Sequence, residues 1–401
     1  MTNALASSPN LGFAEPARRP AVVQVADLTA IAVLRSREEF EAIAADWQAL
    51  EAEVPGATFF QSAGWARAIF AHEGKRSGLD PVIVTLRKCG RLVAVLPLQR
   101  LSGGLSILTP LGDGFAQFSD MLAADILDPA ETAAKLIAAA LAAAPCDLIS
   151  LHKVRDDGHL VAGLRHAVET GEEQGAPFER LSEWADFDAY FGSIRAKTRK
   201  NMRSSRNRLS RDGLLEHRMA ADEAETRAAV ARIVEGRADR LKEQGLTSRA
   251  FADPGFAGFC ESLVGMDGIE IMALSLNRDG QPLSEQWGFV HNGRYYIFMT
   301  SRDFGASEES PGKLHMKDVM ETCFARGIET VDFMTPIMAY KQTWCRQLTG
   351  VRDYAIPVTF KGWARIHIWD RCVRPGLKRL FTALPASLRA VLLRATGRNL
   401  S

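Results

Sequence analysis

Apolar residues along the chain follow two alternating patterns: the three-to-four spacing of amphipathic helices, and short continuous runs typical of buried strands. In the first half these patterns predict a strand at 31–34, a helix at 37–51, a short helix around Trp65, a hairpin of strands 81–86 and 91–98, a strand at 105–108, an Ala-rich helix at 129–144 and a strand at 148–151. Because apolar strands alternate with helices, we expect helices to cover both faces of a sheet.

The second half repeats the same order of elements. A basic helix begins near Ile194. It is followed by a helix at 223–243, a strand at 269–276, a hairpin of strands 283–290 and 294–301, and a helix at 311–325. The hairpin is predicted because Asn292-Gly293 between apolar runs is the strongest short-range hairpin signal. Gly327 ends the last helix before a short strand. The repeated order predicts an α/β (α+β) fold built from two similar units.

The length of 401 residues exceeds the usual size of a single core, so we expect two domains. Residues 1–29 contain several prolines and few apolar side chains, which predicts a disordered tail. The first unit is expected over 30–176 and the second over 177–361. A basic amphipathic tail is expected over 362–401.

Composition excludes several classes of protein. The net charge of +1 is close to zero, and the six cysteines lack the spacing of metal ligands, which suits reduced thiols. Cys345 is the cysteine nearest to the motifs described below. No thiol–His pair, metal-site spacing or Walker loop supports a hydrolase, metalloenzyme or NTPase. No apolar run is long enough to span a membrane, and no secretory signal is recognisable, so we expect a cytoplasmic protein.

Three motifs follow one another in the second half. They are K-T-R-K-N-M-R-x-x-x-x-R-L at 197–209, S-P-G-K-L at 310–314, and Asp332-Phe333 followed by Tyr340-Lys341 and Trp344. Together they resemble the CelD-like acyltransferases of the GNAT superfamily over roughly 30–360, and more distantly the Fem-type aminoacyltransferases. The resemblance implies tandem GNAT-like domains, each a mixed, mostly antiparallel sheet flanked by helices. It also implies N-acyl transfer to an amine, often in cellulose, polysaccharide or envelope biosynthesis.

The acyl donor that the resemblance implies is acyl-CoA such as acetyl-CoA, as a co-substrate rather than a tightly bound cofactor. Gly312 and Lys313 open a helix whose free backbone N–H groups and positive dipole end suit a phosphate. The same residues are also simply a good helix start. The Q/R-x-x-G-x-G/A loop typical of acetyl-CoA-binding GNAT proteins is absent, which leaves the identity of the donor open.

The resemblance places Lys341 at the acyl-transfer centre, where an ammonium would stabilise the tetrahedral oxyanion. Tyr340 would pack the substrate or donate a proton. The alternative is a solvated loop lysine beside a core aromatic residue. The chain departs from the family pattern at Pro336, Ile337 and Met338, so the substrate is expected to differ.

Asp332 and Glu285 are the carboxylates considered as general base, because each lies in an apolar predicted strand where burial would raise its pKa. Alternatively, Asp332 caps the following loop and Glu285 pairs with an arginine. Asp120 resembles a family position that lines the cleft between the halves, and it also fits a turn residue.

The predicted basic helix carries four cations at its start, Lys197, Arg199, Lys200 and Arg203. This density of charge favours a polyanion: a nucleotide-bearing donor, a nucleotide-linked or lipid-phosphate acceptor, or tRNA. DNA is not indicated, since no aromatic residues interleave with the cations. The alternative is a surface helix that pairs with acidic stretches near Glu172 and Asp222.

The tail after Lys361 alternates apolar and cationic residues up to and beyond Pro385. This pattern is typical of an interfacial amphipathic helix pair, so peripheral contact with the inner membrane surface is one interpretation. Packing against the catalytic body or a second protomer is the other.

The sequence therefore predicts an N-acyltransferase that uses acyl-CoA and an amine acceptor such as an amino sugar or an envelope precursor. Two alternatives stay open: an aminoacyl-tRNA-dependent aminoacyltransferase, and a catalytically silent subunit of a polysaccharide-synthesis assembly. Acyl chain length, acceptor and oligomeric state are not predicted.

Overall fold

The computed structural model describes residues 29–373 except 74–77, 247 and 303–310, together with positions 376, 380, 383 and 384. The predicted disordered tail at 1–29 lies outside the described residues apart from Thr29, which begins the first strand. Most of the predicted tail beyond Val373 also lies outside them.

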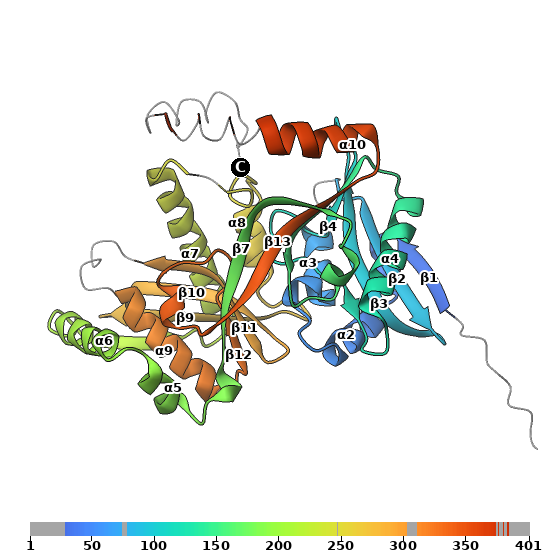
Figure 1. Ribbon diagram of the computed structural model, residues 1–401. Coiled ribbons are helices and arrows are strands. Elements are labelled where there is room, and N and C mark those ends of the chain that lie inside the picture. The colour runs from blue at the N-terminus through green and yellow to red at the C-terminus, as the bar shows by residue number, and fades with distance from the viewer. Residues whose placement is uncertain are drawn as a thin grey trace, which may run out of the picture.

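The described strands form one large mixed sheet, and Figure 1 shows helices on both of its faces. The strands are β1 (Thr29–Leu34), β2 (Pro81–Lys88), β3 (Arg91–Leu101), β4 (Ile107–Pro110), β5 (Leu122–Ala123), β6 (Leu148–Arg155), β7 (Val168–Arg180), β8 (Leu215–Met219), β9 (Glu270–Arg278), β10 (Gln281–His291), β11 (Arg294–Arg302), β12 (Thr330–Asp332) and β13 (Gln347–Pro357). Their order is β1-β2-β3-β4-β6-β13-β7-β12-β11-β10-β9-β8, with β5 beside β3.

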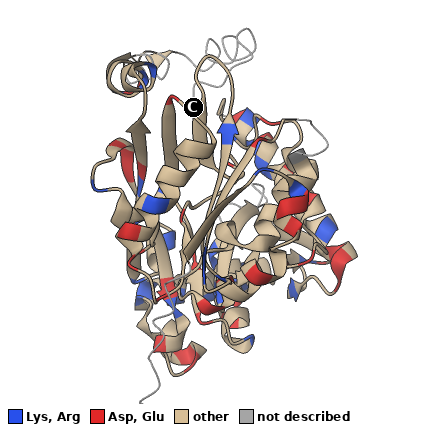
Figure 2. Ribbon diagram, turned by 90° about the vertical axis from the view of Figure 1, so that its right-hand side faces the viewer, with Lys and Arg blue, Asp and Glu red and all other residues tan. Residues whose placement is uncertain are grey.

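The helices divide between the two halves of this sheet. They are α1 (Arg37–Glu41), α2 (Ala44–Glu53), α3 (Ala63–Glu73), α4 (Pro129–Ala143), α5 (Phe187–Ser193), α6 (Ala196–Leu209), α7 (Glu223–Glu243), α8 (Phe256–Ser262), α9 (Pro311–Ala325) and α10 (Phe360–Ala364), with short 3-10 turns η1 (Phe59–Gln61), η2 (Leu160–Gly163), η3 (Leu181–Glu183) and η5 (Lys341–Thr343) and a π-helical segment η6 (Arg365–Val373). The predicted mixed α/β fold is confirmed. Charged residues of both signs are spread over its body (Figure 2).

Helices α7 and α9 cover opposite faces of the second half of the sheet. Val230 of α7 belongs to the same buried cluster as Ala273, whereas Val319 of α9 belongs to the cluster of Met272. Neighbouring residues of a strand point to opposite faces, so the two helices enclose β9 to β11 between them.

The last strand among the described residues, β13, joins the two halves. β13 pairs with β6 from the first half and with β7 along most of its length. The domain boundary expected between residues 176 and 177 falls inside β7, within a continuous sheet, and the division of the chain into domains remains a prediction. The aromatic core also crosses between the halves, since the Phe59 ring stacks on Phe289 with centroids 3.9 Å apart.

Local chemistry explains where the predicted elements hold and where they fail. The hairpin at Asn292-Gly293 is confirmed, with φ of 45° and 69° at the turn residues. The single helix predicted over 37–51 was wrong, because it is two helices separated at Ile43, and the first begins with a capping box at Ser36. Among the described residues, no helix is both long and apolar enough to cross a bilayer.

Candidate functional site

The clearest opening in the second half lies where β11 and β12 part. The two strands are parallel neighbours only from Arg294 to Tyr296, opposite Thr330 to Asp332. Beyond that point β12 ends, and β11 carries an extra residue, Phe298, relative to β10, which is a β-bulge. No described strand pairs with this side of β11 after Tyr296. The backbone groups of that strand edge are therefore available to a ligand.

Helix α9 begins after the free end of β11. Pro311 and Gly312 lie at its first turn, and a Cβ on Gly312 would lie 3.9 Å from the Ser284 hydroxyl of β10. Lys313 is exposed at the same end. The predicted helix start is thus confirmed, and the first-turn N–H groups of an α-helix have no partner within the helix itself. The phosphate-binding role of Gly312 and Lys313 remains a prediction.

Asp332 is fully buried at the end of β12, between two arginines. The Arg155 guanidinium donates to Asp332 Oδ2 at 2.8 Å, and Arg294 donates to the same oxygen at 3.0 Å. The other carboxylate oxygen accepts the backbone N–H of Met334 at 2.8 Å. Burial lowers the pKa of Arg155, but Asp332 and Asp157 outweigh burial and raise it. This carboxylate therefore holds the two arginines and caps the next loop.

Lys341 is also buried, with 5% of its surface exposed. Its ammonium donates to the carbonyl oxygens of Phe333, Met334 and Pro336 at 2.7, 2.8 and 2.9 Å. Burial lowers its pKa to about 8, and Asp332 counteracts part of that effect. All three N–H donors are occupied, so in this structure Lys341 fastens the segment that follows β12. Its role toward an oxyanion remains a prediction.

Tyr340 differs from its neighbour because 39% of its surface is exposed. Partial burial of the side chain raises the pKa of Tyr340, and the positive charges of Arg237 and Arg240 of α7 oppose the rise. The Tyr340 hydroxyl thus interacts electrostatically with the basic C-terminal part of α7. The sequence pattern gave no reason to single out Arg237 and Arg240. Neighbouring Cys345 is half-buried, and burial raises the pKa of its thiol.

Glu285 points to the α7 face of the sheet, where it is 6% exposed. Arg232 donates to its carboxylate at 2.6 Å. The arginine partner considered for Glu285 is therefore present. Since half of the Arg232 side chain faces solvent, this ion pair can exchange with a ligand more easily than the buried pairs of Asp332.

Asp120 lies in the first half and is 9% exposed. Its carboxylate accepts backbone N–H groups from Met121, His159 and Leu160 at 2.8, 3.1 and 2.7 Å. Burial raises its pKa, and these hydrogen bonds oppose the rise. The contacts are those of a carboxylate that shapes a turn, and its role in substrate binding remains a prediction.

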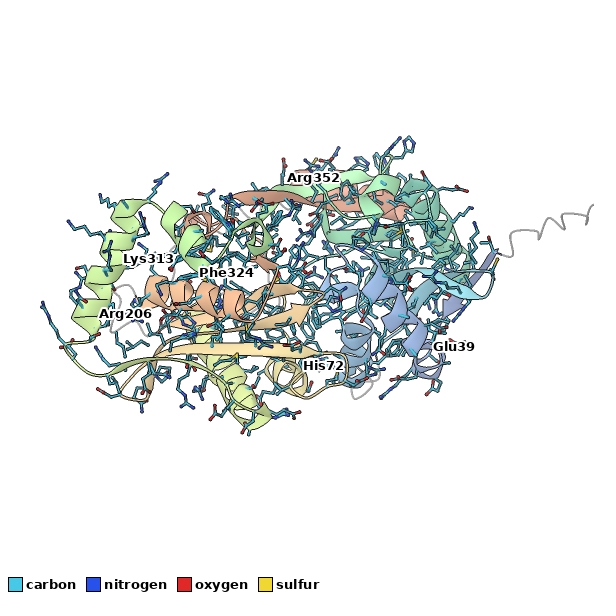
Figure 3. All side chains as sticks on the ribbon, turned by 90° about the horizontal axis from the view of Figure 1, so that it is seen from below. Glu39, His72, Arg206, Lys313, Phe324 and Arg352 are labelled. Carbon is cyan, nitrogen blue, oxygen red and sulfur yellow. The ribbon has the colours of Figure 1, made fainter. Side chains whose placement is uncertain are left out.

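The basic helix α6 runs along the edge of the molecule beside α9 (Figure 3). Lys197, Lys200 and Arg203 are exposed, and Arg199 is half-buried. Among the described residues these four cations form no ion pair with Asp or Glu, and further along the helix Arg206 lies 3.7 Å from Asp318. In the part of the chain that the structure describes, the alternative pairing with acidic stretches near Glu172 and Asp222 is therefore not found for these four cations, and the start of the helix carries positive charge without an acidic partner.

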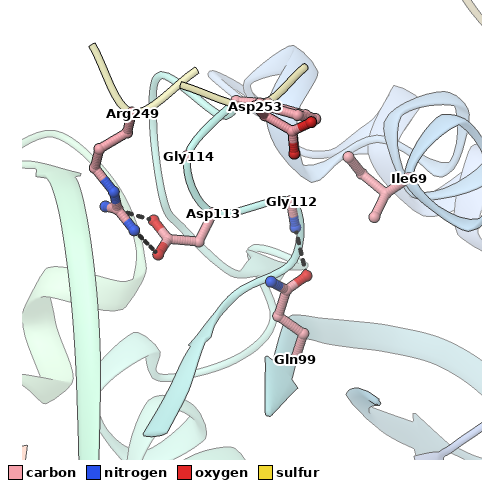
Figure 4. Close-up of a pocket in the computed structure, with 8 residues that line it drawn as sticks. Ile69, Gln99, Gly112, Asp113, Gly114, Arg249 and Asp253 are labelled. Atoms are coloured by element: carbon pink, nitrogen blue, oxygen red, sulfur yellow. Dashed lines mark hydrogen bonds and ion pairs between the residues drawn. The ribbon is translucent and has the colours of Figure 1, made fainter. Parts of the chain in front are cut away.

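A small pocket of about 180 Å³ lies where the two halves meet (Figure 4). Its lining residues are Ile69, Gln99, Gly112, Asp113, Gly114, Phe115, Arg249 and Asp253. Arg249 donates to both Asp113 oxygens at 2.6 and 3.2 Å, and the Gly112 N–H donates to Gln99 at 2.9 Å. Both signs of charge line the walls, so the pocket suits a small polar molecule. The described residues contain no group of three or more His, Cys, Asp or Glu placed to hold a metal ion.

Comparisons with known proteins agree with this geometry. Residues 196–342 match the family model described as "Acetyltransferase (GNAT) domain". The matched span contains α6, the parting of β11 and β12, α9, Asp332 and Lys341. It supports a GNAT-type transferase domain in this part of the chain. No curated protein matches the sequence.

Three solved structures are similar to this chain at low sequence identity, and the likeness to FemX extends to the fold. FemX is 12% identical with a TM-score of 0.57, over 81% of this chain and 98% of that chain. A tandem GNAT protein from the clavulanic acid biosynthesis pathway is 12% identical with a TM-score of 0.45, over 82% and 98%. A conserved protein of unknown function from Bacteroides thetaiotaomicron is 10% identical with a TM-score of 0.48, over 82% and 100%. The FemX likeness concerns the fold alone, and the CelD-like subtype remains a prediction.

Proposed function

We propose that this protein transfers an acyl group from acyl-CoA to an amine, in the cytoplasm. The observation that carries the proposal is the parting of β11 and β12 in front of helix α9, inside the region similar to the GNAT domain. A thioester donor lies along the unpaired edge of β11, and its phosphates bind at Gly312 and Lys313.

The reaction needs one bond to form and one to break. The neutral amine attacks the thioester carbonyl carbon, the C–S bond breaks, and the coenzyme leaves as a thiolate that takes up a proton. Backbone N–H groups at the edge of β11 stabilise the oxyanion formed on the way. Tyr340 supplies the proton to the thiolate. The attacking nitrogen becomes positively charged when its bond to the carbonyl carbon forms, and Glu285, once its carboxylate is no longer paired with Arg232, accepts the proton that this nitrogen loses. Lys341 holds the segment that carries Tyr340 in place.

The acceptor class follows from the resemblance in sequence, and we assign it to amino sugars or related polysaccharide precursors. A second candidate donor is aminoacyl-tRNA. It is favoured by the exposed cations Lys197, Lys200 and Arg203 of α6, which no described acidic side chain neutralises. A silent assembly subunit would bind these molecules without turnover.

Calorimetric titration with CoA, acetyl-CoA and a long-chain acyl-CoA tests the donor, and release of free thiol with a panel of amino sugars tests transfer. Lys313→Gln should weaken acyl-CoA binding several-fold. Lys135→Gln, which replaces an exposed helical lysine of α4 in the first half, is the matched control and should bind normally. Absence of binding by every acyl-CoA would overturn the donor assignment, and sensitivity of transfer to RNase would favour aminoacyl-tRNA. Binding without thiol release would favour the silent subunit.

A further inference from the structure

The C-terminal helical segment formed by α10 and η6 lies across one end of the molecule (Figure 1). It packs on the body through a narrow face. A Cβ on Gly362 would lie only 1.9 Å from the Asp147 carbonyl oxygen, so the helix backbone rests directly on the chain before β6. Ile366 is completely buried against Leu148 and Ala355. The segment is therefore held in a fixed orientation.

The rest of this segment exposes large apolar side chains. The exposed fractions are 77% for Phe360, 44% for Trp363, 51% for Ile368, 43% for Trp369 and 38% for Val373. Phe360 stacks on Trp363 with ring centroids 5.7 Å apart, and the Trp363 ring contacts His367 in a tilted arrangement at 4.9 Å. Five exposed large apolar side chains on one short segment mark an interaction site, because a single exposed apolar residue is common and such a concentration is not.

Charge identifies the partner. Residues 361–401 contain nine Lys or Arg and one acidic residue, Asp370, which pairs with Arg365 at 3.1 Å. Lys361 and Arg371 are exposed on the same segment as Phe360, Trp363 and His367, whose rings form an aromatic row. The segment thus combines interfacial aromatic residues, aliphatic side chains and an excess of positive charge.

We propose that the segment from Phe360 to Val373 docks on an anionic lipid surface with its axis in the plane of the membrane. Trp and Phe favour the headgroup boundary, and Lys and Arg are attracted to anionic headgroups. A second copy of the chain is disfavoured, since it would bring an equally positive tail against this one. The exposed aliphatic side chains of Ile368 and Val373 favour a lipid over a nucleic acid, because a base could stack only on the aromatic residues of the segment. The proposal stands independently of acyl transfer.

The test is co-sedimentation of the full chain with phosphatidylcholine vesicles, with and without phosphatidylglycerol. We expect binding only to the anionic vesicles, and loss of binding at high salt. The double variant Phe360→Ser, Trp363→Ser should reduce partitioning by about tenfold or more. Its matched control is Leu214→Ser, Leu348→Ser, which removes two equally exposed apolar residues elsewhere and should bind like the native chain.

Each other outcome overturns the proposal. Equal binding by the Phe360→Ser, Trp363→Ser variant and its control would remove the aromatic row from the interaction. Failure of the native chain to bind vesicles, with dimers in sedimentation velocity that the variant abolishes, would assign the row to a second copy. Binding to RNA in place of vesicles would assign it to a nucleic acid. Thermal unfolding of both variants should match the native chain, because the replaced side chains face solvent.

Discussion

Arg155, near the end of β6, donates a 2.8 Å hydrogen bond to Asp332 at the end of β12, so a buried ion pair links the two halves of the chain. The same guanidinium forms two further bonds with Asp157, at 2.8 and 2.9 Å, and lies 4.6 Å from the Phe118 ring centre. Arg294 completes the set around Asp332. Two arginines and two carboxylates therefore form a connected set of ion pairs at the end of β12, next to the point where β11 and β12 separate.

Replacement of Asp332 by Asn should destabilise the whole protein. Removing one partner of a buried ion pair leaves uncompensated charge, and we expect the free energy of unfolding to fall by about 3 kcal/mol or more. Urea unfolding measures this. Arg352→Ala, which removes exposed ion pairs with Asp156 and Glu173, should change stability little. Loss of turnover with unchanged stability would instead support Asp332 as the general base.

Lys341→Met should loosen the segment after β12. Methionine replaces the aliphatic stem, but the carbonyls of Phe333 and Met334 lose their donor inside the protein. We expect a loss of about 2–4 kcal/mol in unfolding free energy and faster amide exchange over 333–344. Lys313→Met, at an exposed position, is the control for both measurements. A variant that loses only turnover would favour the oxyanion role over the structural one.

Glu51 should make stability decline between acidic and neutral pH. It is buried in α2, accepts the Ala63 N–H at 2.7 Å, and burial raises its pKa from 4.5 to about 7. The folded state therefore retains a proton that the unfolded chain releases. Stability from this group is complete below about pH 4.5 and is lost as the pH rises through about 7.

Glu51→Gln keeps an oxygen acceptor for Ala63 and removes the charge. At pH 8 we expect this variant to be more stable than the native chain by about 2–3 kcal/mol, and the difference should vanish near pH 4.5. Unfolding by urea at several pH values measures it. Glu53→Gln, an exposed change in the same helix, should leave the pH dependence as it is. Equal pH curves for Glu51→Gln and the native chain would contradict the assignment.

Sequence patterns located the elements that depend on residues close together in the sequence. They missed the elements that form only through pairing with segments far away along the chain. Helix α9 and the turn at Asn292-Gly293 follow from periodicity and turn chemistry. The Gly/Glu-rich run at 170–176 lacks apolar periodicity, yet it is a strand because β13 pairs with it. A Cβ on Gly175 would lie 2.7 Å from the tip of the exposed Ile337 side chain, so a larger residue at this position would have to displace that side chain.

The same distinction applies to the site. The motif around Asp332 and Lys341 drew attention to the correct segment, because its residues are close in sequence. The partner of Asp332 is Arg155, which lies 177 positions away. No spacing rule connects the two. The pocket lined by Asp113 and Arg249 likewise depends on a contact between residues 136 positions apart.

His315 should make the protein sensitive to acid. It is 2% exposed in α9, and neither ring nitrogen has a hydrogen-bond partner among the described residues. Burial lowers its pKa to about 3, and nearby His217 adds to the effect. The His315 ring therefore stays neutral in the folded state at pH values where the same ring in the unfolded chain binds a proton, below about pH 6.5. Stability should fall as the pH drops from there, by about 2 kcal/mol at pH 5 from this residue alone.

His315→Met fills a similar volume without a titrating group, so it should unfold less readily than the native chain at pH 5 while the two stay close at neutral pH. Urea unfolding at both pH values gives the comparison. His166→Met, at an exposed position, should follow the native curve throughout. The His315 ring of α9 lies near the ring of His217 of β8, with centroids 5.9 Å apart. A native-like acid response in His315→Met would therefore assign the acid sensitivity to His217 or to the half-buried His291.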